Sequence, residues 1–116
     1  MRERDIEKKL IKGVKKLGGE CLKWVSPGNT GVPDRIVILP SGDIFFVELK
    51  GENGRLSGQQ DYWQFRLKEL NCSAVVLYGF DAVDWFLKQI GPYAWTDEIR
   101  DMITSMVEEG NEEEGR

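Results

Sequence analysis

The sequence contains no histidine among its 116 residues. Without an imidazole, the chain cannot build a histidine-based catalytic triad, use a histidine general base or hold zinc through histidine. It also has no apolar run near the roughly 20 residues that a membrane-spanning helix requires. Its charged N-terminus lacks the apolar stretch of a secretion signal. We therefore expect neither a membrane partner nor export.

Cysteine is scarce as well, because only Cys21 and Cys72 are present. Two cysteines in separate apolar, strand-like segments do not make a disulfide framework. We expect two buried, reduced thiols, which are typical of a reducing compartment. The cytoplasm of a bacterium or of a phage-infected cell is the expected location.

The acidic balance of the chain is concentrated at its C-terminal end. The formal net charge is −4, but residues 97–116 hold eight acidic and two basic side chains. Residues 1–96 therefore carry a net charge of +2. The acidic isoelectric point consequently does not argue against a polyanionic substrate.

Hydrophobic periodicity predicts one α/β domain over residues 1–92, with the element order αβββαβα. In the first helix, for example, Ile6, Leu10 and Val14 recur at intervals of three and four, and Gly18 with Gly19 ends the pattern. Ser57 is expected to cap the second helix. The predicted helices cover residues 3–17, 57–70 and 81–90, and the predicted strands cover residues 20–25, 34–39, 44–50 and 73–78.

A further amphipathic helix is predicted within residues 93–110, where Ile99, Met102, Ile103, Met106 and Val107 form one apolar stripe. This stripe could pack on its own domain or on a second copy of the chain. The acidic residues 111–116 are expected to be disordered.

Four large aromatic side chains are expected to lie in the core rather than to stack on nucleic-acid bases. These side chains are Trp63, Phe65, Trp85 and Phe86. Trp24, beside the glycine-rich segment 26–31, is the exception to which a stacking role is open.

The chemistry-bearing residues lie on two neighbouring strands. Asp34 follows Pro33, and fourteen residues later Glu48 precedes Lys50 by two positions. Strand parity places Phe46, Glu48 and Lys50 on one face, and Phe45, Val47 and Leu49 on the core face. Two carboxylates beside an ammonium are the groups that metal-assisted phosphodiester hydrolysis requires.

The hairpin register decides whether Asp34 shares the face of Glu48. Paired residue numbers must sum to an even value. With a three-residue loop at residues 41–43, the two residue numbers of each cross-strand pair sum to 84, which places Asp34 opposite Lys50. A two-residue loop at 41–42 gives 83 and needs a bulge to correct it. A metal site therefore predicts an odd loop or a bulge.

Taken with Glu7, the segments Gly31–Arg35, Phe46–Lys50 and Leu56–Gln60 resemble the VRR-NUC family of the PD-(D/E)xK nuclease superfamily. The similarity extends over about residues 3–90, and the type resembled is the short, stand-alone one of phages and bacteria. It implies a restriction-endonuclease-like fold, in which a central mixed sheet is flanked by helices. No organic cofactor is implied.

The resemblance also implies roles for individual residues. Asp34, Glu48 and the backbone carbonyl of Leu49 would coordinate Mg²⁺ or Mn²⁺, and Glu7 would bind the ion directly or through water. Lys50 would orient or help to deprotonate the attacking water. Gln60 resembles a helix glutamine that lies beside the active site.

DNA contacts are predicted near this site, because phosphate binding needs basic or hydroxyl groups. The candidates are Lys23, Arg35, Arg55 and Ser57. For the lysines along the first helix, a solvated face is the simpler interpretation.

The predicted function is metal-dependent cleavage of DNA, with branched DNA such as a Holliday junction as substrate and a homodimer as the active form. The alternatives are a general or flap-type nuclease, a non-catalytic DNA-binding or assembly module, and an interaction protein that functions through its C-terminal helix.

Overall fold

A computed structural model describes residues 2–91 and Ser105. The predicted C-terminal helix and acidic tail therefore lie outside the described residues, except for Ser105. Among the described residues, no helix is both long and apolar enough to cross a membrane. Both cysteines are free thiols, and each is half-buried rather than fully buried as predicted. Burial raises the pKa of the Cys21 thiol to about 11.

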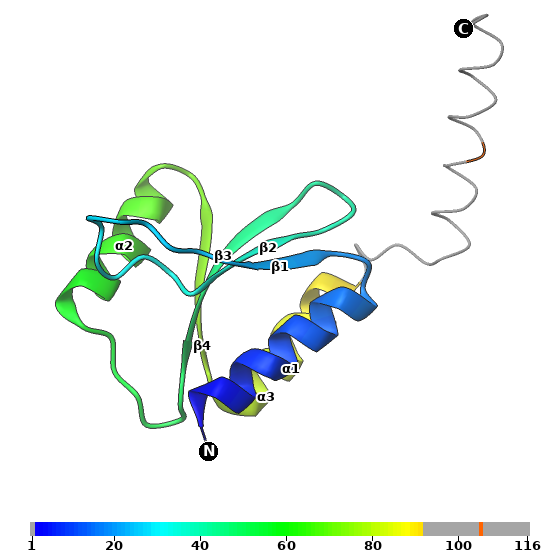
Figure 1. Ribbon diagram of the computed structural model, residues 1–116, viewed down its shortest axis with the longest axis horizontal. Coiled ribbons are helices and arrows are strands. Elements are labelled where there is room, and N and C mark those ends of the chain that lie inside the picture. Colours follow the sequence, from blue (N-terminus) through cyan, green and yellow to red (C-terminus); the bar gives the residue numbers. More distant parts are fainter. Residues whose placement is uncertain (1, 92–104, 106–116) are drawn as a thin grey trace, which may run out of the picture.

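The element order is the predicted αβββαβα (Figure 1). Its helices are α1 (Glu3–Lys16), α2 (Gly58–Glu69) and α3 (Gly79–Ile90), and its strands are β1 (Glu20–Lys23), β2 (Arg35–Ile38), β3 (Ile44–Lys50) and β4 (Ser73–Tyr78). The four strands form one mixed sheet in the order β1-β2-β3-β4. Only β3 and β4 are parallel, and α2 makes the crossover between them.

The core lies between the sheet and the helices α1 and α3, which run side by side (Figure 1). Val47 and Leu49 of β3 are buried there, which confirms the predicted core face of that strand. From α1, Ile6, Leu10 and Val14 reach zero exposure. The opposite face of β3, which carries Glu48, is consequently left for polar chemistry.

The register of the β2–β3 hairpin has even parity, as a shared face for Asp34 and Glu48 requires. Arg35 pairs with Val47, so the pairing sum is 82 rather than the expected 84. The loop consists of residues 40–42, and Gly42 takes a positive φ of 92°. Extending the pairing by one residue places Asp34 opposite Glu48 instead of Lys50.

Helix α2 contacts β4 through an unexpected face. Its buried residues are Gln64 and Leu67, and the Gln64 Nε2–H donates to the Val75 carbonyl. Phe65 is 63% exposed, and Trp85 of α3 is 60% exposed, so the prediction that both lie in the core is wrong. Phe86 is buried as predicted, and Trp63 is half-buried with its Nε1–H donating to the Thr30 carbonyl. Among the described residues, the side of α2 that carries Tyr62 and Phe65 faces solvent.

The segment before Asp34 is fixed by close packing on the start of α2. Pro33 is fully buried. Gly31 has a φ of 92°, and a Cβ at this position would lie 2.6 Å from the Gln59 carbonyl carbon and 2.8 Å from the Gln60 amide nitrogen. Backbone atoms cannot move aside as a flexible side chain can. A glycine at position 31 is therefore required by both conformation and space.

Gly31→Ala should lower the free energy of unfolding by about 3 kcal/mol, because left-handed strain of about 1 kcal/mol is joined by a backbone clash. Gly28→Ala is the matched control, since Gly28 has a φ of 83° but nothing within 4 Å of its added Cβ. Urea denaturation measures both variants. Equal losses for the two would show that Gly31 is not packed as described.

Candidate active site

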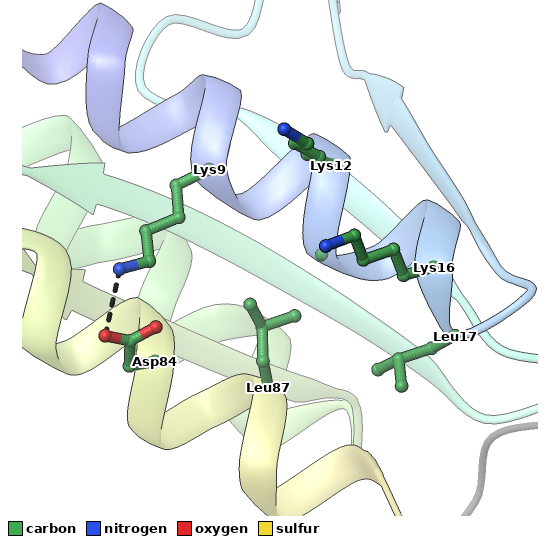
Figure 2. A pocket seen from close by; sticks show the side chains of 7 residues that line it. Lys9, Lys12, Lys16, Leu17, Asp84 and Leu87 are labelled. Carbon is green, nitrogen blue, oxygen red and sulfur yellow. Dashed lines mark ion pairs between the residues drawn. The ribbon is translucent and has the colours of Figure 1, made fainter.

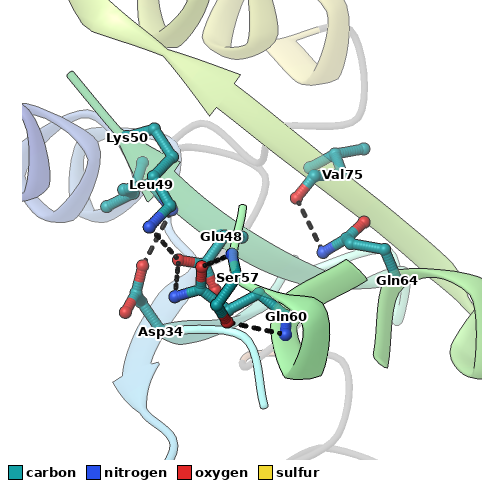
Figure 3. Close-up of polar contacts among 8 residues, drawn as sticks. All are labelled: Asp34, Glu48, Leu49, Lys50, Ser57, Gln60, Gln64 and Val75. Carbon is teal, nitrogen blue, oxygen red and sulfur yellow. Dashed lines mark hydrogen bonds and ion pairs between the residues drawn. The ribbon is translucent and has the colours of Figure 1, made fainter. Parts of the chain in front are cut away.

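Asp34 and Glu48 meet where β2 begins and β3 nears its end, and Asp34 lies within reach of the first turns of α1. Figure 3 shows their side chains together with those of Lys50 and Gln60 at the start of α2. Asp34 directly precedes β2, Glu48 and Lys50 belong to β3, and Gln60 belongs to the crossover helix.

Glu48 is an ionisable side chain held almost completely out of water, with an exposure of 2%. Its Oε2 accepts a hydrogen bond from Gln60 Nε2 at 3.3 Å and lies 4.0 Å from Lys50 Nζ. Its Oε1 is buried and has no hydrogen-bond partner among the described residues. A buried polar atom without a partner is costly, so this oxygen is suited to receive a cation.

The electrostatics of the site disfavour a negative charge on Glu48. Burial, followed by the nearby Asp34 carboxylate, raises the pKa of Glu48 from its ordinary 4.5 to about 8, and the Lys50 ammonium opposes this only in part. Both main causes would be reversed by a bound cation, which neutralises the pair and replaces the lost hydration.

Gln60 is oriented by the cap of α2. Ser57 Oγ accepts from the Gln60 backbone N–H at 3.1 Å, while Gln60 Oε1 accepts from the Ser57 backbone N–H at 2.9 Å. This is a reciprocal capping box, and it confirms Ser57 as the helix cap. Because Oε1 is occupied, the Nε2 donor is the end that faces Glu48. Gln60 thus completes the capping box of α2 and also donates a hydrogen bond to the Glu48 carboxylate.

Asp34 is tied to the next strand through its own carboxylate. Its Oδ2 accepts from the Leu49 backbone N–H at 2.8 Å. The N–H and C=O of a strand residue point to the same side, so the Leu49 carbonyl faces the edge where Asp34 lies. Asp34 and Leu49 line a pocket of about 240 Å³ together with Glu3, Arg4 and Glu7 of α1.

These groups fit a divalent cation that keeps part of its water shell. Among the described residues, no three acidic or cysteine side chains are close enough together to hold a metal ion by themselves. The carboxylates of Asp34 and Glu48, the latter with its unpartnered Oε1, and the Leu49 backbone carbonyl remain. Mg²⁺ prefers such a set, because it binds few protein oxygens and retains several waters.

Comparisons with known proteins identify the family of this chain. The VRR-NUC domain family matches residues 3–81. The chain belongs to the VRR-NUC family. It is 46% identical over 77 residues to a protein named "Putative nuclease p44" from Acyrthosiphon pisum secondary endosymbiont phage 1, which covers 66% of this chain and 83% of that protein. A solved structure of a VRR_NUC domain superposes with a TM-score of 0.71 at 32% identity, covering 74% of this chain and 94% of the solved one.

Within this VRR-NUC domain, Glu7 forms an ion pair with Arg35 of the same chain. Arg35 Nε donates to Glu7 Oε2 at 2.8 Å, and Arg35 Nη1 donates to the Cys21 carbonyl at 3.2 Å. Arg35 lies on the α1 face of β2, and its side chain is only 15% exposed. The side chain of Arg35, for which a DNA contact was predicted, is therefore paired with Glu7 inside the protein. Glu7 lines the pocket beside Asp34 as part of this ion pair.

The other predicted DNA-contact residues lie on the surface of the VRR-NUC domain. Lys23 is exposed on β1 opposite Arg35, and Arg55 is exposed in the loop that leads to α2. Ser57 is exposed too, but its hydroxyl caps the helix. Arg4 of α1 lines the carboxylate pocket and was missed. Its position three residues before Glu7 is a signal that could have identified it.

A larger pocket of about 380 Å³ between α1 and α3 lacks this chemistry (Figure 2). Its rim carries Lys9, Lys12 and Lys16, and its floor is formed by leucines. The one carboxylate there, Asp84, is paired with Lys9 at 2.9 Å. The smaller pocket beside Asp34 is therefore the candidate active site.

Glu48→Gln should stabilise the metal-free protein on the order of 2 kcal/mol at pH 8, and much less at pH 5. The folded state keeps a proton on Glu48 up to about pH 8, whereas the unfolded chain releases it near pH 4.5. The wild type should consequently lose stability as the pH rises between these two values. Denaturant unfolding across this range, in the presence of a chelator, measures the effect.

The exposed Glu20 supplies the control, because Glu20→Gln should change stability by less than about 0.5 kcal/mol at either pH. If Glu48→Gln lowered the stability equally at pH 5 and pH 8, the buried carboxylate would be a structural hydrogen-bonding group.

Proposed function

We propose that this protein is a Mg²⁺- or Mn²⁺-dependent DNA endonuclease that cleaves branched DNA as a homodimer. The observation that carries the metal dependence is the buried, unpartnered Oε1 of Glu48 beside Asp34. Phosphodiester hydrolysis is supported by membership of the VRR-NUC family and by the phage relative that is named a nuclease.

Asp34, Glu48 and the Leu49 carbonyl would hold the cation, and Glu7 would contact it through water. When bound, a divalent ion lowers the pKa of an attached water and offsets the charge that builds on the phosphoryl oxygens. The protein supplies the orientation. The Leu49 N–H fixes one oxygen of Asp34, and the Gln60 amide fixes one oxygen of Glu48.

Lys50 is placed to act on the attacking water. Its Nζ lies 4.0 Å from Glu48 Oε2, and its side chain is only 13% exposed. An ammonium cannot ligate a cation, but it stabilises a hydroxide nearby and donates hydrogen bonds to it. We assign Lys50 to orienting the water and to helping its deprotonation.

The grip on DNA would come from exposed basic side chains around the pocket. Arg4 lines it, and Lys23 and Arg55 lie on exposed segments near it. Such contacts hold phosphates without reading sequence. The pocket therefore favours selection by DNA shape.

Lys50→Ala and Glu48→Ala should each reduce cleavage of labelled four-way-junction DNA at least 100-fold in Mg²⁺, because each removes a group from the reacting centre. Lys88→Ala on α3 is the matched control, since Lys88 is exposed and lies outside both pockets. Linear duplex and flap DNA tested in parallel would separate a branch-selective enzyme from a general or flap-type nuclease.

If the wild type cut none of these DNAs with either metal ion, the protein would be a binding or assembly module. If it cut them while Lys50→Ala retained full activity, the assignment of Lys50 would be wrong.

The homodimer is proposed from the sequence alone, in which Ile99, Met102, Ile103, Met106 and Val107 recur at helical spacing and could pack on a second copy or on their own domain. Light scattering of the full chain and of a chain ending at residue 96 should give a dimer and a monomer, respectively. A full-length monomer that cuts junctions symmetrically would contradict the dimer.

A further inference from the structure

Two aromatic rings meet on the sheet face that carries the active site. The ring centroids of Trp24 and Phe46 lie 5.2 Å apart, with an angle of 48° between the planes. Phe46 belongs to β3, whereas Trp24 follows directly after β1. Because β2 lies between these strands, the two rings reach across it and meet above it. Both side chains are half-buried, so part of each ring remains open to solvent.

Backbone pairing fixes these rings beside the site carboxylates. The Trp24 N–H donates to the Asp34 carbonyl at 3.0 Å, which continues the β1–β2 register and places Trp24 opposite Asp34. Paired residues point to the same face of a sheet, so the indole and the Asp34 carboxylate are neighbours. Phe46 precedes Glu48 by two residues, roughly 7 Å along the same face.

No described helix covers this part of the sheet. Helix α2 packs mainly on β4, at the other edge, and reaches β3 through the Gln60–Glu48 hydrogen bond. Beside the rings, Leu22 of β1 lies in register with Ile36 and Phe46 on the same face, and it is 46% exposed. An exposed apolar area that borders a polar catalytic pocket is typical of a binding surface.

We propose that the Trp24–Phe46 pair stacks on an unpaired nucleobase next to the phosphate that the cation held by Asp34 and Glu48 would bind. The inference rests on the proposed nuclease function and narrows its substrate class to DNA with an unpaired nucleotide beside the branch. A ring face binds a base face, and within a duplex both faces of each base are already stacked on neighbours. Only an unpaired nucleotide offers a free face, and its phosphate then lies beside that cation.

A purely structural role makes a different prediction. If the rings only shield Ile36 beneath them, their loss should weaken folding and affect every DNA equally. Trp24→Leu separates the two roles, because leucine retains an apolar cover but has no ring face. Trp24→Phe retains a ring and should restore the function.

The test is equilibrium binding by fluorescence anisotropy, in a chelator so that nothing is cleaved. The probes are a splayed-arm DNA with unpaired nucleotides and a fully paired linear duplex of the same length. Trp24→Leu should weaken binding to the splayed-arm DNA about tenfold, since stacking contributes about 1–3 kcal/mol per base. It should leave duplex binding within about twofold, and Trp24→Phe should bind both probes like the wild type.

Trp85→Leu is the matched control. Trp85 is 60% exposed on α3, which packs on the other face of the sheet, so neither affinity should change. Equal losses on both probes, or no loss on either, would overturn the stacking assignment while leaving the nuclease proposal intact. If Trp24→Leu converted a dimer into a monomer, the Trp24–Phe46 surface would be a dimer interface and the stacking assignment would be wrong. Wild-type protein that binds neither probe in the chelator, and cuts neither probe when Mg²⁺ or Mn²⁺ is added, would contradict the proposed function itself, and the stacking role with it.

Discussion

The buried carboxylate of Glu48 is the group on which the rest of the site depends. Val47 and Leu49, its neighbours in β3, are buried in the core, and Glu48 itself is almost completely shielded from water. Asp34 lies opposite Glu48 on the neighbouring strand register. Both conditions oppose ionisation of Glu48. The divalent cation that we propose would offset both, because it would neutralise the two carboxylates and use the buried Oε1 that has no hydrogen-bond partner among the described residues.

The surrounding elements serve to hold that arrangement in place. Gly31 lets the chain pass against the start of α2, which fixes both the approach to Asp34 and the position of Gln60. The capping box then presents the Gln60 amide to Glu48. Because the same glutamine completes the helix cap and donates to Glu48, a change in the cap should alter the position of the Glu48 carboxylate. Fold and chemistry are therefore coupled through a few short-range contacts.

Much of this was predictable from sequence because the decisive signals are local. Alternation along β3 identified the face of Glu48, and Ser57 identified the start of α2. The register sum of 82 was not predictable, since it depends on Gly42 adopting a positive φ in the turn. The pairing of Glu7 with Arg35 and the exposure of Phe65 depend on how helices sit on the sheet, which composition does not determine.

The most direct test of the proposed metal site is Mn²⁺ binding, monitored through the electron paramagnetic resonance signal of the unbound ion. The wild type should bind the ion, and Glu48→Gln should weaken binding at least tenfold, because it removes a charged ligand while keeping the shape of the side chain. Binding should also release a proton near pH 7, as the pKa of about 8 for Glu48 requires. Equal affinity in the two proteins, with no proton released, would contradict the claim that Glu48 is the buried ligand of a divalent cation.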